Sequence, residues 1–162
     1  MAALPSFIRT HFRFLFWGSL IFLFLLLGTQ YILRHQDQIL FVSSSELPKK
    51  VSLGEKAYAL ERALTNEERA LGLGGRENLC RDCGMLFVFS EPALPGFWMK
   101  DMRFPLDIVW LLDDTVVHIE RNVPFDSPDT FYPKNMANRV LEFNAGETKE
   151  ITPGERLQFL YK

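Results

Sequence analysis

Residues Gly84–Leu112 read GMLFVFSEPALPGFWMKDMRFPLDIVWLL. Two apolar runs, Met85–Phe89 and Ile108–Leu112, enclose a shorter one at Phe97–Met99, and prolines and glycines separate the three. Short runs of aromatic and branched side chains with such boundaries are typical of buried strands. We therefore expect this stretch to form the centre of a β core.

The same stretch carries charged side chains that a core would not be expected to contain. Asp107 immediately precedes the run Ile108–Leu112, and its nearest candidate partners in the sequence are Lys100 and Arg103. A carboxylate in this position must be solvated, paired or hydrogen-bonded, because burying a bare charge is very costly. Asp107 is therefore either structural, as an ion pair or a cap on backbone N–H groups, or a ligand-binding or acid–base group.

The composition favours one folded domain with an appendage. The chain has 162 residues, of which 48% are hydrophobic, and a formal net charge of −2. This length is that of a single domain. Because the charge provides no basic patch, we expect no nucleic-acid partner.

Phe14–Leu33 is an uncharged, apolar segment of the length that a helix needs to cross a membrane. Trp17 and Tyr31 lie towards its ends, where aromatic rings prefer the interface. A buried soluble helix and a cleaved signal peptide are the alternatives, but no convincing small-residue cleavage site follows the apolar run. Two arginines precede the segment, so the positive-inside rule predicts a single-pass plasma (inner) membrane protein with residues 1–13 in the cytoplasm and the remainder outside.

The rest of the chain divides into a linker and an extracytoplasmic domain. Residues 34–50 are a juxtamembrane linker, in which Ile39–Val42 is either a first strand or lies against the bilayer. Residues 51–162 are enough for a single core without a metal or several disulfides.

Short strands and turn residues alternate along this domain. Lys56–Ala63 has the alternation of a strand, and Thr65 with Glu68 forms a capping box for a short helix that ends at the glycines starting with Gly72. Two acidic turn residues, Asp113-Asp114, predict a hairpin. Further strands are expected at Val116–Arg121, Arg139–Phe143 and Leu157–Tyr161. The pattern predicts a mainly β domain, a compact β sandwich or barrel with one short helix.

Several motifs then occur in one order over about residues 56–161. They are Glu68-Arg69, Gly72-Leu73, Gly84–Phe89, Phe97–Lys100, Pro105–Ile108, Val140–Glu142 and Ala145-Gly146. In this order they resemble the uncharacterised family known as domain of unknown function 192. The resemblance implies a small β sandwich or barrel, often behind an N-terminal signal or anchor, and it implies no activity, substrate or catalytic residue.

Cys80 and Cys83 form a C-x-x-C pair and are the only cysteines. We expect a local structural disulfide, because disulfides persist outside the cytoplasm. Free thiols and a redox or metal role are the alternatives. No thioredoxin-like βαβ pattern surrounds the pair, however, and the domain has only one histidine, His118, as a further zinc ligand. We expect no metal and no cofactor.

The candidate ligand-binding residues are Trp98, Lys100, Asp107, Glu142 and Arg69. Trp98 and Lys100 share one side of a strand, with Phe97 on the other. An exposed tryptophan beside a cation suits stacking against a sugar or another ring, although tryptophan is more often packed in a core. Arg69, on the short helix, is either an anion contact or part of a surface salt bridge.

Glu142 lies in the apolar strand Val140–Phe143. Simple alternation places it in water, with Leu141 and Phe143 in the core. Alternatively, it shares a sheet face with Asp107, and the two acids form a carboxylate pair.

These features favour a membrane-anchored, extracytoplasmic β domain of the cell envelope that binds a ligand or a protein partner and has no chemistry of its own. One alternative is a carboxylate-dependent hydrolase or lyase of envelope glycans, with Asp107 and Glu142 as acid and base. The other is a purely structural envelope scaffold. Carboxyl groups more than about 10 Å apart, or on opposite faces of the sheet, would argue against the two-carboxylate mechanism.

Overall fold

The computed structural model describes residues 28–30, which are helical, and residues 47–161. The chain divides into two units after Ser43, and all the described strands belong to the second unit. No helix within the described residues is long and apolar enough to cross a membrane. Apart from residues 28–30, the predicted anchor lies outside the described residues, and so does Ile39–Val42.

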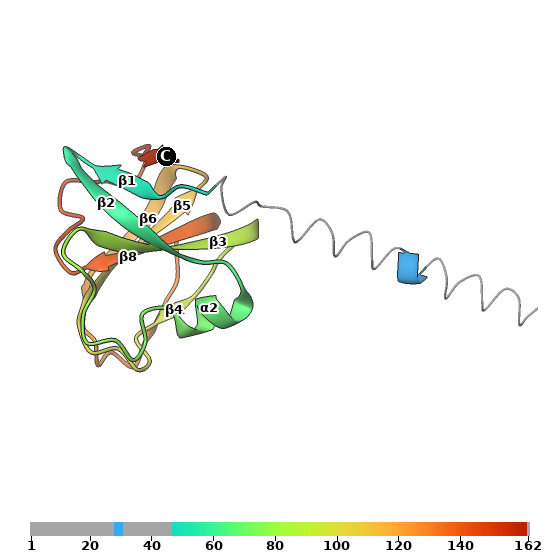
Figure 1. Cartoon of the computed structure of the whole chain (residues 1–162), viewed down its shortest axis with the longest axis horizontal. Coiled ribbons are helices and arrows are strands. Elements are labelled where there is room, and N and C mark those ends of the chain that lie inside the picture. Colours follow the sequence, from blue (N-terminus) through green and yellow to red (C-terminus); the bar gives the residue numbers. More distant parts are fainter. Residues whose placement is uncertain (1–27, 31–46, 162) are drawn as a thin grey trace, which may run out of the picture. The chain divides into compact units, whose positions relative to one another are not determined.

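The second unit is mainly β, as the strand pattern predicted (Figure 1). The described residues form nine strands and, in this unit, one short helix. In chain order these are β1 (Lys50–Leu53), β2 (Lys56–Ala63), α2 (Asn66–Leu71), β3 (Cys83–Ala93), β4 (Phe97–Trp98), β5 (Leu106–Leu112), β6 (Thr115–Val123), β7 (Thr130–Phe131), β8 (Ala137–Asn144) and β9 (Gln158–Leu160).

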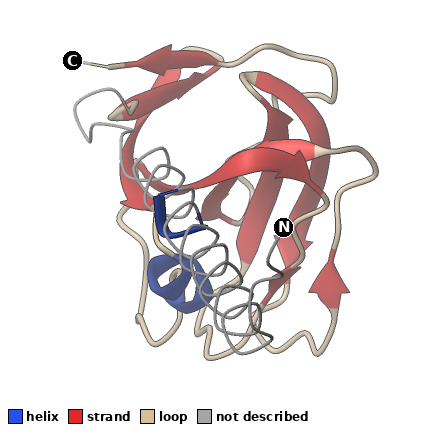
Figure 2. Ribbon diagram, turned by 90° about the vertical axis from the view of Figure 1, so that its right-hand side faces the viewer, coloured by secondary structure: helices blue, strands red, loops and turns tan. Residues whose placement is uncertain are grey.

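Seven strands form one sheet in the order β6-β5-β8-β3-β2-β1-β9, while β4 and β7 form a separate two-stranded ribbon. Neighbouring strands are antiparallel except for β2 and β3, which are parallel. At one corner the N–H of Val116 in β6 donates to the carbonyl of Glu155 at 2.8 Å, and the N–H of Leu157, just before β9, donates to that of Asp114 at 2.9 Å. These bonds hold the edge strand β6 against the segment before β9, and the sheet is curled into a half-barrel (Figure 2).

The hairpin expected at Asp113-Asp114 is confirmed. Leu112 pairs with Thr115 across these two residues. Asp113 has a φ of 55°, in the left-handed region that aspartate tolerates better than most residues. The hairpin sets the pairs nearest the turn, and the register of β5 against β6 shifts between Trp110 and Leu111 and again between Leu106 and Ile108. Against β8, in contrast, β5 pairs without a shift from Leu106 to Leu111.

Apolar side chains cover both faces of the curled sheet. Its interior is filled from all seven strands, with Val109 and Leu111 contributed by β5. The outer face of β5 carries Ile108 and Trp110, which pack with Phe97 of β4 and with the segment that follows α2. Because both faces are covered, Leu106–Leu111 is buried throughout and shows no alternation of apolar and polar residues.

Candidate functional site

A cavity of about 320 Å³ lies on the outer side of the sheet, between α2 and β4. Its apolar wall comes from Phe87 and Phe89 of β3. Its polar groups come from α2, from the residues around β4 and from β8, and they are Asn66, Arg69, Trp98, Lys100 and Glu142. Four of the five candidate ligand-binding residues therefore line one cavity, and Asp107 does not. That these four bind a ligand stays a prediction.

The predicted capping box fixes the start of α2, which forms one side of the cavity. The side chain of Thr65 accepts a hydrogen bond from the N–H of Glu68 at 3.1 Å, and the Glu68 carboxylate accepts one from the N–H of Thr65 at 2.9 Å. The helix ends at Gly72, whose φ is 50°, a conformation that glycine adopts without a steric penalty. The chain therefore turns sharply there, and Gly72–Gly74 complete this side of the cavity.

Arg69 is held by neutral groups. Its guanidinium donates to the carbonyl oxygens of Leu64 and Val88, the latter at 2.9 Å, and to the Asn66 side chain at 2.6 Å. It also lies over the ring of Phe89, with its central carbon 5.2 Å from the ring centroid. Within residues 47–161 it forms no ion pair with a carboxylate, so the structure does not support the alternative of a surface salt bridge. That Arg69 contacts an anion stays a prediction.

Trp98 and Lys100 lie on the exposed side of their segment. Phe97 is buried and packs edge-on against the rings of Phe87, at 4.8 Å, and Trp110, at 5.9 Å. By alternation Trp98 points the other way and is 55% exposed, so the sequence assigned the two neighbouring aromatic residues to opposite sides correctly. Lys100 is exposed and forms no ion pair with any described residue.

Glu142 is buried rather than solvated. It is 5% exposed, and on the neighbouring strands it lies opposite Met85 and Ile108, two buried apolar residues. The prediction that alternation would leave it in water is therefore wrong, because a second apolar layer covers this face. Burial raises the pKa of Glu142 to about 8, and its Oε2 atom has no hydrogen-bond partner.

Asp107 is fully buried and accepts hydrogen bonds from the end of β6 and from the turn after β8. Its carboxylate accepts hydrogen bonds from the N–H groups of Asn122 at 2.8 Å, Gly146 at 3.0 Å and Thr148 at 3.0 Å. The Thr148 hydroxyl donates a fourth at 2.8 Å. These contacts make Asp107 a cap on backbone N–H groups, the structural alternative considered above, and they place it outside the cavity.

At neutral pH the cavity carries positive charge. Lys100 and Arg69 bring two cations, while Glu142 is mostly uncharged because of its raised pKa. A second depression adjoins the cavity and shares Trp98 and Lys100 with it. It continues to Asp101 and to Arg103, which is paired with Glu77.

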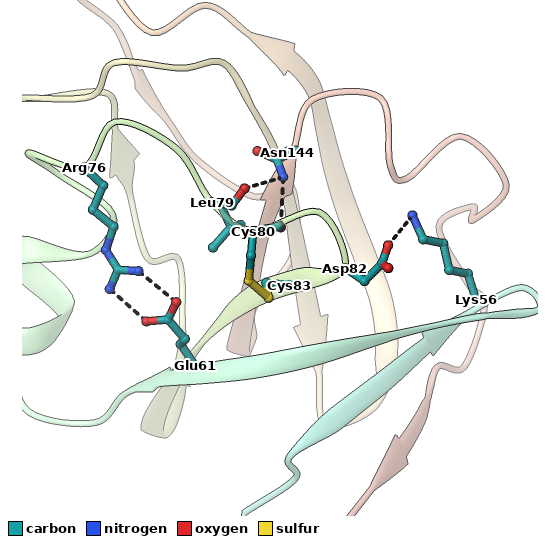
Figure 3. The surroundings of a disulfide bond; sticks show 8 residues. All are labelled: Lys56, Glu61, Arg76, Leu79, Cys80, Asp82, Cys83 and Asn144. Atoms are coloured by element: carbon teal, nitrogen blue, oxygen red, sulfur yellow. Dashed lines mark hydrogen bonds and ion pairs between the residues drawn. A yellow bond between two sulfur atoms is a disulfide. The ribbon is translucent and has the colours of Figure 1, made fainter.

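The cysteine pair lies at the start of β3 and does not line the cavity. Cys80 and Cys83 form a disulfide (Figure 3). The side-chain amide of Asn144 donates to the carbonyls of Leu79 and Cys80, at 3.2 and 3.3 Å. The bridge therefore closes a small loop that is itself attached to β8. No group of three or more potential metal ligands is present among the residues that the structure describes.

Sequence reasoning missed Asn66 and the aromatic wall of the cavity. Asn66 follows the capping Thr65 directly, and nothing in the sequence distinguishes it from an ordinary first helical residue. Phe87 and Phe89 were expected as core residues, and only the packing of α2 against them creates a concave surface.

Three comparisons place the domain among known proteins. The family model DUF192, described as "Uncharacterized ACR", matches residues 49–159. A solved structure of a proposed transcription regulator from Sinorhizobium meliloti 1021 is 30% identical and covers 68% of this chain and 90% of its own, with a TM-score of 0.63. The structure of a protein of unknown function from Novosphingobium aromaticivorans DSM 12444 is 31% identical and covers 69% of this chain and 84% of its own, with a TM-score of 0.62. The comparison with curated proteins finds no match.

Proposed function

We propose that this chain, which belongs to the DUF192 family of uncharacterised proteins, is a binding module whose cavity beside α2 takes a small anionic ligand that contains a ring. The observation that carries this proposal is the pair of cations in one cavity, Lys100 and Arg69. Neither forms a direct ion pair among the described residues, although Arg69 interacts electrostatically with Glu68 on the same helix. A bound anion would supply the missing counter-charge.

The cavity favours an anion over a cation for a further reason. Arg69 is fixed by carbonyl and amide oxygens and by the ring of Phe89, so its position does not depend on a bound ligand. A preorganised guanidinium loses little conformational entropy when an anion binds. Lys100, in contrast, is an exposed and flexible cation that can adjust to the ligand.

Trp98 supports a ligand with a ring. More than half of this side chain is exposed, at the mouth of a cavity whose wall is already aromatic. Its indole face offers a stacking surface for an aromatic ring or for the apolar face of a sugar. The cavity volume of about 320 Å³ lies at the lower end of the range for small-molecule sites.

The two alternatives receive less support. A hydrolase or lyase of envelope glycans would need Asp107 and Glu142 as a facing pair, but Asp107 lies outside the cavity that Glu142 lines. A scaffold without a ligand would have no use for an orphaned polar atom and two cations without direct ion pairs in one concave site.

The membrane anchor and the extracytoplasmic location are part of this proposal. The uncharged segment at residues 14–33 supports an anchor. The Cys80–Cys83 disulfide supports an oxidising compartment. Reporter fusions at Lys50 should be active only with an extracytoplasmic reporter, and a cytoplasmic signal or release of the domain by signal peptidase would contradict the topology.

The binding proposal is tested with the full-length chain in detergent, screened against small anions by thermal shift and then by calorimetry. Lys100→Ala and Trp98→Ala should weaken the binding of any hit at least tenfold. Lys134→Ala is the matched control, because Lys134 is an exposed lysine that lines none of the cavities described here. Equal affinities for Lys100→Ala and Lys134→Ala would exclude this cavity as the anion site.

A further inference from the structure

We infer that Glu142 selects the ligand of this cavity, because its uncharged carboxyl group donates a hydrogen bond to an oxygen atom on the ring of an anion whose charge is held by Lys100 and Arg69. The inference rests on the proposed function and names the class of ligand: a small acid in which a ring carries a second oxygen as a hydrogen-bond acceptor.

The orphaned oxygen of Glu142 is the starting point. Buried polar atoms in folded proteins nearly always have a hydrogen-bond partner, so each exception needs an explanation. The exception here is an atom of a residue that lines a cavity, on a side chain that is 5% exposed. The Oε2 atom itself is enclosed, so a ligand that enters the cavity supplies the missing partner when the Glu142 carboxyl group turns towards it.

The surroundings of Glu142 favour the protonated acid. The residues opposite Glu142 on the neighbouring strands are Met85 of β3 and Ile108 of β5, and both are apolar. The charged groups that line the same cavity are Arg69 from α2 and Lys100 from the segment after β4, and neither bonds to Glu142. Burial alone raises the pKa of Glu142, so at neutral pH its carboxyl group keeps a proton that it can donate.

A protonated Glu142 also resolves an electrostatic conflict. A carboxylate in this position would repel the anion that Lys100 and Arg69 attract, because all three residues line one small cavity. The neutral acid removes that repulsion and adds a donor. The cavity then offers a stacking surface at Trp98, the positive charges of Lys100 and Arg69, and one buried hydrogen-bond donor, the Glu142 carboxyl group.

Two sources of ligand share this chemistry, and they are the two arms of the experiment. 4-Hydroxybenzoate is an aromatic acid with a hydroxyl group attached to its ring, and glucuronate is a sugar acid with several hydroxyl groups attached to its ring. The affinity of the full-length chain for each is measured by calorimetry between pH 6.5 and 9.5. The proteins compared are the wild type, Glu142→Gln and Glu142→Leu, and melting temperatures confirm that each variant is folded.

For at least one probe, wild-type affinity should fall about tenfold from neutral pH to pH 9, because only about a tenth of Glu142 stays protonated one unit above its pKa of about 8. Glu142→Gln keeps a donor that does not titrate, so it should bind like the wild type at pH 7 and lose less affinity at pH 9. Glu142→Leu should bind at least tenfold more weakly at every pH.

The inference is overturned if neither probe binds the wild type, if Glu142→Leu binds as tightly as the wild type, or if the wild type and Glu142→Gln respond identically to pH. Failure of the proposed function looks different. In that case Lys100→Ala leaves anion affinity unchanged, whereas here Lys100→Ala weakens binding and only the Glu142 variants behave contrary to expectation.

Discussion

Asp107 and Glu142 lie on neighbouring strands one position out of register, and their side chains therefore enter opposite faces of the sheet. The pairing of β5 with β8 sets Asp107 opposite Phe143, and Ile108 opposite Glu142. Because successive side chains of a strand alternate, Asp107 lies on the interior side with Phe143, whereas Glu142 enters the outer layer with Ile108. The Asp107 carboxylate accepts hydrogen bonds from three backbone N–H groups and one hydroxyl, whereas Glu142 is left with an oxygen that has no partner.

Asp107→Asn should destabilise the fold without changing ligand binding. The amide that replaces one carboxylate oxygen would face N–H donors, and the charge-assisted bonds to Asn122, Gly146 and Thr148 would weaken or be lost. We expect a loss of about 2–3 kcal/mol in the free energy of unfolding. Chemical denaturation measures it, with Asp126→Asn as an exposed control. A stable Asp107→Asn protein with impaired anion binding would return Asp107 to the site.

Glu142→Gln should stabilise the protein, and increasingly so as the pH rises. The pKa of Glu142 rises from its ordinary value of 4.5 to about 8 on folding, so between these values the folded state holds a proton that the unfolded state has lost. The wild-type free energy of unfolding then falls as the pH rises through this window and levels off above it. Glutamine does not ionise and avoids this loss, which is at most about 1.4 kcal/mol per pH unit.

Denaturation of wild type and Glu142→Gln at pH 5, 6.5 and 8 measures this effect. The stability difference between the two proteins should widen across the series. Glu91→Gln, at an exposed position of β3, is the matched control and should show no such divergence. A constant difference between wild type and Glu142→Gln would mean that Glu142 ionises alike in the folded and unfolded states.

The Cys80–Cys83 disulfide should contribute little to stability. A bridge with a sequence separation of 3 closes a very short loop and removes little entropy from the unfolded chain. The double Ser variant should therefore fold and lose less than about 3 kcal/mol. Native thiol labelling should fail until a reductant is added. If the double variant does not fold, the bridge is central to the domain; if it folds but loses an activity, the redox alternative gains support.

Gly84→Ala should destabilise the sheet because the ring of Phe143 occupies the space beside Gly84. These residues are paired across β3 and β8, and an added Cβ would lie 2.6 Å from a carbon of that ring. Displacing a ring that is packed in the core against Tyr58 typically costs about 1–3 kcal/mol. Phe143→Leu in the same chain should relieve the clash, so the two changes together should cost less than their sum. Strict additivity in thermal denaturation would contradict this account.

Local patterns in the sequence were sufficient for most elements of the fold. Lys56–Ala63 is the strand that its alternation predicted, Thr65 and Glu68 form the expected capping box, and the Asp113-Asp114 hairpin is present. Each of these depends on residues within a few positions of one another. The same is true of Phe97 and Trp98, whose opposite exposure follows from the period of a strand.

The two acidic residues show where such patterns stop being informative. Alternation placed Glu142 in water, and it would have been right for a sheet with one covered face. A strand cannot signal that a second apolar layer, here Phe97 and the segment after α2, will cover its other side. In the same way, the residues around Asp107 in the sequence do not indicate that Gly146 and Thr148, far along the chain, will donate hydrogen bonds to its carboxylate.

The sequence by itself determined most of the strands, the capped helix, the turns and the polar residues available to a site, because period, capping and turn chemistry act between near neighbours. It did not predict β1 or the short strand β7. Only the tertiary structure decided that β2 and β3 run parallel, that the sheet curls until β6 meets the segment before β9, and that Glu142 rather than Asp107 shares a cavity with Lys100 and Arg69. These outcomes depend on register and on the covering of both sheet faces, and both are set by contacts between residues distant in the chain.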